Sequence, residues 1–196
     1  MKILQVITSL QIGGAEHVVV HLTKLLRKKG HMVDVVVFNG EETAFMRELE
    51  ETGCRIYKLG RGVYNITYIL KLRRIMREYD IIHTHNSSPQ LFVAIANIGL
   101  RKVLITTEHS TNNRKREHPM FSFVDKWMYG KYAKVVTISK IAEEKLCSYL
   151  GLESNQPSSP LQRRIVTINN GVDVNAFYHA QDLPDLAHWG KFITVM

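Results

Sequence analysis

The stretch Lys2-Ile3-Leu4-Gln5-Val6-Ile7-Thr8 is followed, after a short connection, by Gly13-Gly14-Ala15-Glu16. A short apolar run that ends at a glycine turn and continues into a helical pattern is typical of the first strand, loop and helix of an α/β fold. Gly30 is placed to end that helix in the left-handed conformation. The helical pattern is an apolar stripe at three- and four-residue steps, formed by Ala15, Val18, Val19, Leu22, Leu25 and Leu26.

The same alternation of apolar runs and helical patterns continues along the chain. The run Val33–Phe38 is nearly continuous in β-branched and aromatic residues, which predicts a strand covered on both faces. Together the pattern predicts a Rossmann-like, doubly wound α/β fold with a mostly parallel sheet of about seven strands and helices on both faces. The expected strands are Lys2–Thr8, Met32–Phe38, Cys54–Leu59, Asp80–Thr84, Val103–Thr107, Lys134–Ile138 and Ile165–Ile168, and further helices are expected at about 42–52, 65–78, 90–98, 119–131 and 140–150.

The alternation stops near residue 174. Residues 151–163 have the composition of a turn-rich surface loop, and residues 175–190 show no clear period and are expected to form an interdomain linker. Residues 191–196 have the pattern of another buried strand. We therefore expect residues 1–174 to form one Rossmann-like domain and residues 191–196 to be the first strand of a truncated second domain, so that the chain is a fragment.

Composition limits the class of protein. Of 196 residues, 45% are hydrophobic and 22% charged, which is a globular composition and excludes a disordered or collagen-like chain. Two cysteines, Cys54 and Cys147, are too few for a disulfide framework or a four-cysteine zinc site and fit a reducing cytosol. The N-terminus lacks a signal-peptide core, and no stretch reaches the about 18 apolar residues of a membrane span. These features predict a cytoplasmic protein.

The net charge of +8 is unevenly distributed. Residues 101–140 hold nine Lys or Arg against three Asp or Glu, and Arg114, Lys115 and Arg116 stand together within them. Such a basic segment indicates either a solvated face or a surface for an anion such as phosphate or an acidic lipid headgroup. Because the sequence contains no helix-turn-helix, zinc-finger or RNP-like motif, we do not expect a nucleic acid partner.

Gly13 and Gly14 stand at the turn from the first strand to the first helix. Glycines there let the backbone approach a ligand, and the N–H groups and positive dipole end of the helix favour an anion such as a diphosphate. The spacing differs from the G-x-G-x-x-G dinucleotide fingerprint, and no Gly-Lys-Ser/Thr follows as in a P-loop. A tight turn that requires small residues is the alternative interpretation.

Polar residues gather where the later strands end. His83 and His85 share one face of the fourth strand, and one of them is expected to be buried while the other borders a cleft. His109 follows the fifth strand and could act as an acid, a base or a hydrogen-bond donor, or be structural. No third ligand at metal spacing accompanies the histidine pair, so we expect no metal site. Ser139 is expected to cap the helix that follows it.

These elements, in this order, resemble the N-terminal half of glycosyltransferase family 4, the retaining GT-B transferases. The resemblance implies two Rossmann-like domains that face a cleft, the first mainly taking the acceptor and the second holding a nucleotide-sugar. It covers nearly the whole chain and is carried by Gly13–Glu16, Asp80–His85, Thr107–Ser110, Thr137–Ser139 and Asn170–Asp173.

The resemblance also implies residue roles. Gly13 and Gly14 would approach the donor diphosphate, and His109 would be the cleft histidine near the transferred sugar, the one residue expected to be catalytic. It implies a nucleotide-sugar as co-substrate, with no other cofactor and no obligate metal. The residues expected to line the acceptor side of the cleft are His85, Asn86, Ser110, Asn170 and Gly171.

The acceptor is expected to be a saccharide or a lipid-linked molecule, in the synthesis of a cell-surface polysaccharide. A lipid-linked acceptor would account for the basic residues Arg114, Lys115 and Arg116, as a surface for an anionic membrane, and would give the protein a peripheral position on the inner face of the cell membrane. We expect this fragment to be inactive by itself, because the second domain normally supplies the groups that hold the leaving diphosphate.

The residues alone leave two other classes of protein possible. The chain could be a non-catalytic sugar- or lipid-binding module, which would account for the basic surface without a second domain. It could also be an NAD-type oxidoreductase with a Rossmann domain, although the missing third glycine after Gly13-Gly14 argues against this class.

Overall fold

A single parallel sheet organises the chain. The computed structural model describes residues 1–62, 64–109, 119–152 and 159–171. Within these ranges seven strands lie in the order β3-β2-β1-β4-β5-β6-β7, and every neighbouring pair is parallel. The strands are β1 (Lys2–Ile7), β2 (Met32–Asn39), β3 (Ile56–Gly60), β4 (Ile81–His85), β5 (Val103–Glu108), β6 (Lys134–Thr137) and β7 (Ile165–Thr167).

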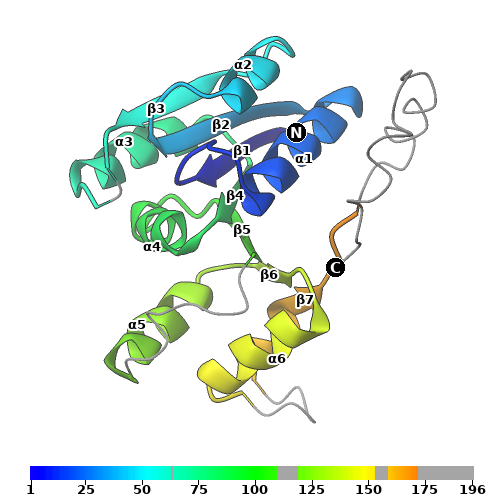
Figure 1. Cartoon of the computed structure of the whole chain (residues 1–196). Helices are drawn as coiled ribbons and strands as arrows, with labels where there is room; N and C mark the ends of the chain where they lie inside the picture. The colour runs from blue at the N-terminus through cyan, green and yellow to red at the C-terminus, as the bar shows by residue number, and fades with distance from the viewer. Residues whose placement is uncertain (63, 110–118, 153–158, 172–196) are drawn as a thin grey trace, which may run out of the picture.

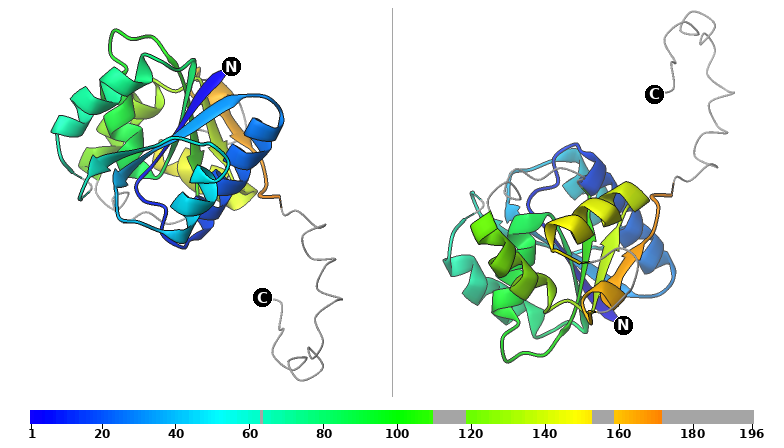
Figure 2. Two further views of the ribbon diagram at one scale, coloured as in Figure 1. Left: turned by 90° about the horizontal axis from the view of Figure 1, so that it is seen from above. Right: turned by 90° about the horizontal axis from the view of Figure 1, so that it is seen from below.

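The helices form a layer on each face of this sheet (Figure 1 and Figure 2). The helices α1 and α2 pack on one face, over a core that includes Ile7, Val37 and Met46. The later helices pack on the other face, over a larger core that includes Tyr68 and Leu146. The helices are α1 (Gly14–Lys28), α2 (Ala44–Glu50), α3 (Thr67–Met76), α4 (Ser87–Ala96), α5 (Pro119–Tyr129) and α6 (Lys140–Tyr149), with a 3₁₀ turn at Gln162–Arg164.

The predicted fold class is confirmed. Each of the seven expected strands is present, and the order of strands and faces is that of a Rossmann-like, doubly wound sheet. From Val35 to Phe38 the side chains of β2 are fully buried, as expected of a strand covered on both faces. Gly30 has a φ of +82° and ends α1, and its N–H donates to the carbonyl of Arg27.

The predicted boundaries differ by a few residues. The third strand begins at Ile56 instead of Cys54, and the fourth helix begins at Ser87 instead of residue 90, with Pro89 still in its first turn. The segment 151–163, predicted as a loop, reaches the first two residues of the 3₁₀ turn Gln162–Arg164. Fraying ends and short 3₁₀ turns leave almost no periodic signal, which explains these differences. The expected linker 175–190 and the strand 191–196 lie outside the described residues.

Candidate functional site

The strand order reverses between β1 and β4, and this place defines the candidate site. In an open parallel sheet the loops after the two strands diverge at such a point and leave a crevice at the carboxyl edge. The helices α1 and α4 start beside this crevice, after the neighbouring strands β1 and β4. Neither helix has a side-chain cap, whereas α2 and α6 are capped by Thr43 and Ser139. The first-turn N–H groups of α1 and α4 are therefore not covered by a cap from their own chain segment.

The two glycines at the start of α1 differ in how open they are. Gly14 is exposed, and a Cβ placed there would meet no atom of the described residues within 4 Å. Gly13 is half-buried, and a Cβ at that position would collide with the Glu16 carboxylate. The backbone of Gly13 is extended, so a glycine is not required there for a left-handed conformation. A ligand approaching the helix N-terminus would therefore meet Gly14 first, while Glu16 stands beside Gly13.

Asn86 begins α4 in an unusual conformation. Its φ is +71° and its ψ is 153°, a region that residues other than glycine rarely adopt. Its Oδ1 atom is buried and has no hydrogen-bond partner among the described residues. Backbone strain and an unpaired polar atom together are typical of functional positions, where the surrounding structure holds a residue in a costly geometry.

Three histidines cluster next to the crevice: His83 and His85 of β4 and His109, which directly follows β5. His85 is fully buried, and its Nδ1 lies 2.9 Å from Nε2 of His109. The rings of His83 and His85 have centroids 4.2 Å apart, and His83 Nε2 lies 2.8 Å from the Thr107 hydroxyl. This cluster faces the side of the sheet that α1 and α2 cover, but β4 and β5 lie beyond those helices. Neither α1 nor α2 covers this part of the sheet, so the side chains here do not have to be apolar.

The cluster is electrically neutral at neutral pH. Burial lowers the pKa of His83 to about 3 and the pKa of His109 to about 4. The pKa of His85 is lowered well below its ordinary value by burial and by the two neighbouring rings. A neutral imidazole offers one hydrogen-bond donor and one acceptor. At neutral pH, His109 is therefore better suited to form a hydrogen bond with a ligand hydroxyl than to act as a general acid.

A second polar network supports the end of β5 from the opposite face. The buried Glu108 carboxylate accepts hydrogen bonds from Tyr129 of α5, at 2.6 Å, and from Gln90 of α4. Gln90 also donates to the Thr106 hydroxyl at 2.8 Å. These contacts fix the strand that carries His109 against two helices, so that the ring stands on a rigid element.

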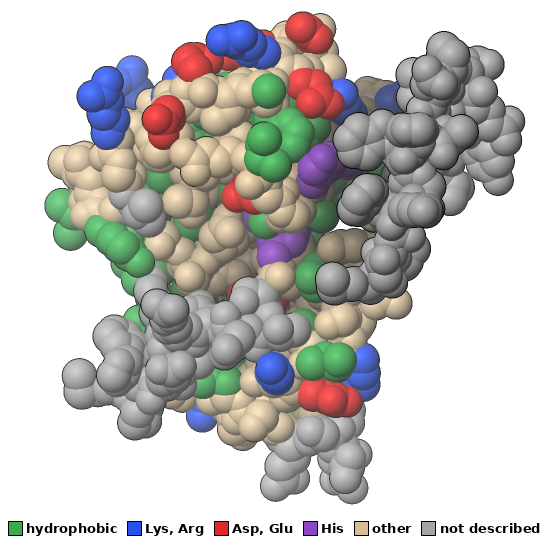
Figure 3. Space-filling model, viewed as in Figure 1, with side chains coloured by type: hydrophobic (Ala, Val, Ile, Leu, Met, Phe, Trp, Pro, Cys, Tyr) green, Lys and Arg blue, Asp and Glu red, His purple; other side chains and the backbone are tan. Residues whose placement is uncertain are grey.

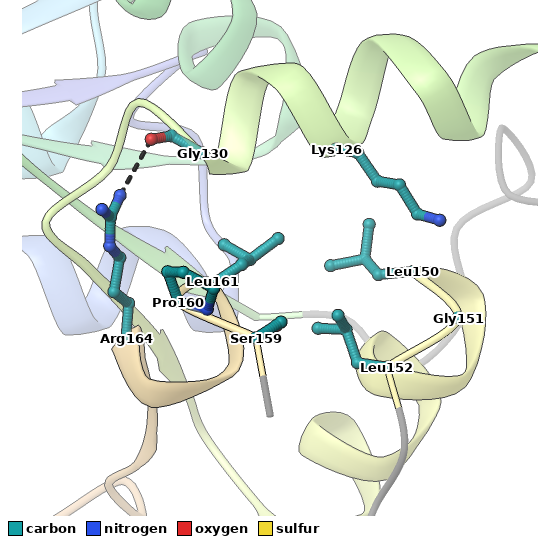
Figure 4. Close-up of a pocket in the computed structure, with 9 residues that line it drawn as sticks. All are labelled: Lys126, Gly130, Leu150, Gly151, Leu152, Ser159, Pro160, Leu161 and Arg164. Carbon is teal, nitrogen blue, oxygen red and sulfur yellow. Dashed lines mark hydrogen bonds between the residues drawn. The ribbon is translucent and has the colours of Figure 1, made fainter. Parts of the chain in front are cut away.

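Two cavities lie at opposite edges of the sheet. One, of about 340 Å³, lies at the carboxyl edge beside the loop after β1, and its polar lining includes Gln11, Glu41 and Glu42. The other, of about 380 Å³, lies between the C-terminal ends of α5 and α6 and the segment before β7 (Figure 4). That second cavity belongs to the amino edge, where Arg164 donates to the carbonyl of Gly130. The first cavity therefore lies at the same edge as the crevice, between the segments that follow β1 and β2.

Histidine side chains reach the surface on the face seen in Figure 3, with hydrophobic and other side chains around them. Ile12, in the loop between β1 and α1, is 92% exposed at the carboxyl edge of the sheet. Exposed apolar side chains also follow other strands at this edge, among them Ile66 after β3 and Ile168 after β7.

The structure brings together some predicted site residues and separates others. Gly13, Gly14, His85, Asn86 and His109 follow or end β1, β4 and β5, which are adjacent in the sheet. The ring of His85 is completely buried, with its Nδ1 2.9 Å from Nε2 of His109, and its place on the acceptor side stays a prediction. Of the two strand histidines, His83 is the partly exposed one, although both lie on the same face of β4.

Other predicted residues do not join this group. Asn170 and Gly171 are exposed after β7, which lies three strands from β4, or about 14 Å at the usual strand spacing. Ser110, Arg114, Lys115 and Arg116 lie outside the described residues.

Sequence reasoning missed Gln5. This buried side chain in β1 places its Oε1 2.8 Å from Nε2 of His85. One signal was available, because Gln5 is the polar residue inside the otherwise apolar run Ile3–Ile7. A buried amide inside a hydrophobic strand needs a partner, and that partner is usually informative. The lining residues Gln11 and Glu41, joined by a 3.2 Å hydrogen bond, carried no comparable signal.

Neither a metal cluster nor a membrane span is found in the described ranges. No three or more His, Cys, Asp and Glu side chains are grouped there so as to hold a metal ion. No helix there combines the length and the apolar character needed to cross a bilayer.

Solved structures with the same fold include glycosyltransferases and an epimerase. Anabaena Alr3699/HepE, in a complex with UDP, is 20% identical over 90% of this chain and 46% of its own, with a TM-score of 0.72. A glycosyltransferase from Rickettsia africae is 20% identical over 96% of this chain and 48% of its own, with a TM-score of 0.72. UDP-GlcNAc 2-epimerase from Neisseria meningitidis is 12% identical over 97% of this chain and 52% of its own, with a TM-score of 0.62.

These likenesses concern the fold, and the chain spans about half the length of the structures it matches. No curated protein matches the sequence. The family is decided by a separate comparison, in which the model described as Glycosyltransferase Family 4 matches residues 12–176. Because that match covers most of the sequence, the chain belongs to glycosyltransferase family 4.

Proposed function

We propose that this chain is the acceptor-binding half of a glycosyltransferase that moves a sugar from a nucleotide-sugar donor to a saccharide or lipid-linked acceptor. The observation that carries the proposal is the position of Gly14 and His109 at one edge of the sheet, on either side of the switch point. Donor binding is supported by HepE, whose structures contain UDP, glucose and UDP-glucose. A second domain, joined through residues 175–190 and starting at residues 191–196, completes the cleft in this proposal.

The proposed chemistry depends on charge at the leaving group. Breaking the sugar–phosphate bond leaves negative charge on the nucleoside diphosphate, and preorganised dipoles that face this charge lower the barrier. The open N-terminus of α1 supplies such a dipole at Gly14. The proposal includes retention of the anomeric configuration and no resident metal or other cofactor, as the family resemblance implies.

His109 has a different task in this proposal. Its lowered pKa keeps the ring neutral, so it forms a hydrogen bond to a hydroxyl of the transferred sugar and does not balance phosphate charge. The acceptor enters beside Asn86 and the cavity lined by Gln11 and Glu41. Amide and carboxylate groups of this kind bind sugar hydroxyls well, because they offer both donors and acceptors.

A peripheral position on an anionic membrane is the further part of the proposal, and it suits a lipid-linked acceptor in cell-surface polysaccharide synthesis. Between Lys58 and Arg77 the sequence holds six Lys or Arg and no Asp or Glu. Within this basic stretch, Tyr64, Ile66 and Leu70 are each at least 70% exposed around the start of α3. Exposed apolar side chains among cations are typical of a surface that lies on acidic lipid.

The helix α5, on the same side of the sheet, carries further exposed aromatic side chains. Phe123 is 80% exposed, and Trp127 is 37% exposed. We name Tyr64, Ile66 and Leu70 the apolar patch, whereas Phe123 and Trp127 lie on α5, beyond α4, which packs between α3 and α5. Hydrophobic side chains gather on the α3 side of the face in Figure 3. The patch supports membrane contact independently of Arg114, Lys115 and Arg116.

The test is sugar transfer by the full-length protein. We expect His109→Ala to lose transfer while the circular dichroism spectrum and the melting temperature stay close to wild type. His31→Ala is the matched control, because His31 lies in the turn between α1 and β2, on the other edge of the sheet. Wild-type transfer by His109→Ala would remove the proposed role. The proton spectrum of the product tests retention, and absence of transfer from any nucleotide-sugar would favour the non-catalytic binding module.

A further inference from the structure

The side chain of Gln5 contacts the histidine cluster from inside the sheet. It is fully buried in β1, 80 positions before the residue that it contacts. Its carbonyl oxygen Oε1 lies 2.8 Å from Nε2 of His85. A carbonyl oxygen can only accept a hydrogen bond, so the Nε2 atom of His85 must carry the proton.

This proton position has a consequence for the next ring. A neutral imidazole has one N–H, so a proton on Nε2 of His85 leaves its Nδ1 as an acceptor. That Nδ1 lies 2.9 Å from Nε2 of His109, which must then donate. The neutral ring of His109 is left with a bare Nδ1. Both rings are neutral near pH 7, because burial lowers their pKa values.

We propose that Gln5 is a positioning residue that, through the buried ring of His85, holds His109 in the tautomer whose Nδ1 is a hydrogen-bond acceptor. The consequence for transfer rests on the proposed function, in which His109 meets a sugar hydroxyl. In that role the bare Nδ1 accepts the hydrogen bond of the hydroxyl. The other tautomer would offer an N–H, so the hydroxyl would have to accept and its own proton would be left to find another partner.

A purely structural role for Gln5 is a poor alternative. Its Nε2 atom is buried and has no partner among the described residues, which costs stability. An apolar residue of similar size would avoid that cost at a fully buried position of β1. The retained amide is therefore better explained by the hydrogen bond to His85 than by packing.

Two substitutions separate these roles. Gln5→Met removes the acceptor oxygen and keeps the volume, whereas Gln5→Glu keeps an acceptor oxygen at His85. The control is Thr23→Val, which removes another buried polar group of α1 that has no partner among the described residues. Nitrogen-15 chemical shifts of labelled histidines distinguish a bare ring nitrogen from a protonated one and need no activity.

In wild-type full-length protein we expect a bare Nδ1 at His109. Gln5→Met should populate both tautomers and lower kcat about tenfold, the effect of one hydrogen bond, with the donor KM preserved. Gln5→Glu should keep the wild-type tautomer, and Thr23→Val should change neither the tautomer nor kcat.

A protonated Nδ1 in wild type, or an unchanged tautomer in Gln5→Met, would overturn the proposal. A changed tautomer with wild-type kcat would overturn the positioning role, whereas loss of transfer in every variant and in wild type would count against the proposed function alone.

Discussion

His85 and His109 are joined by a hydrogen bond of 2.9 Å between Nδ1 and Nε2, although 24 positions separate them in the chain. The first ring is completely buried and the second is partly exposed at the carboxyl edge of the sheet. A partly exposed ring is therefore oriented by a buried one, as functional side chains commonly are. This relationship makes the cluster sensitive to pH, to its neighbours and to the adjoining backbone.

The stability of the domain should fall as the pH falls below about 6.5, the ordinary pKa of histidine in an unfolded chain. The native pKa values of His83, at about 3, and His109, at about 4, lie below this, so the unfolded state binds protons first. Stability is therefore complete above pH 6.5 and is lost as the pH falls through the native pKa values. A fully buried ring such as His85 contributes up to about 1.4 kcal/mol per pH unit, and the partly exposed His109 contributes less.

Urea unfolding at pH 7, 6 and 5 measures this effect. His109→Asn should reduce the pH dependence, because one neutral ring is removed. A free energy of unfolding that stays constant or rises between pH 7 and pH 5 would contradict the burial of neutral histidines.

Gly14→Ala should weaken donor binding without harming the fold. The added methyl group meets no atom in the described part of the chain, and alanine favours the helix by up to about 1 kcal/mol. If the donor diphosphate approaches this backbone, the methyl group will displace it, and the KM for the donor should rise about tenfold or more. Lys140→Ala, at the first position of α6, is the control. An unchanged donor KM in Gly14→Ala would place the diphosphate elsewhere.

Asn86→Gly should stabilise the domain by about 1 kcal/mol, because glycine adopts the positive φ of this position with less strain. The same change should reduce transfer, since the side-chain amide at the crevice is lost. Arg101→Gly is the matched control, because Arg101 also has a positive φ, of 56°, at the amino edge of the sheet. Thermal melts and initial rates measure both effects. Equal rates for Asn86→Gly and wild type would argue against a role of Asn86 in acceptor binding.

Ser139→Ala should destabilise the domain by about 1 kcal/mol, because the serine hydroxyl accepts a hydrogen bond from the Ala142 N–H, at 3.2 Å, and caps α6. Thr43→Ala, which removes the corresponding cap of α2, should have a similar effect. Transfer measured well below the melting temperature should stay near wild type. A selective loss of transfer with unchanged stability would instead assign Ser139 to the site.

Ile66→Ser with Leu70→Ser should weaken membrane binding. Two exposed apolar side chains that enter the lipid interface contribute enough free energy for an about tenfold change in the binding constant. Sedimentation with vesicles that contain phosphatidylglycerol, at low salt, measures this change. Ile141→Ser is the control, because Ile141 is 60% exposed on α6. Equal sedimentation of the double variant and wild type, or no binding of wild type, would contradict the membrane surface.

Much of the fold could be predicted because the signals are local. The continuous apolar run Val35–Phe38 needed cover on both faces, and Gly30 and Ser139 marked helix ends through their own backbone and side-chain chemistry. The position of Gly14 at the carboxyl edge followed from the strand–loop–helix pattern. What could not be predicted is the degree of burial of each polar residue, which placed His85 inside the domain and left Gly14 open.

The sequence by itself determined the parallel, doubly wound sheet and the edge at which the site lies, because apolar periodicity and turn residues act over a few neighbouring positions. Only the tertiary structure decided that Gln5, His85 and His109 form one chain of hydrogen bonds. These residues belong to or follow three different strands. The alternation of side chains along one strand does not specify which of its residues lie beside which residues of the next strand. Register and burial, which are properties of the assembled sheet, turned three separate polar residues into one cluster.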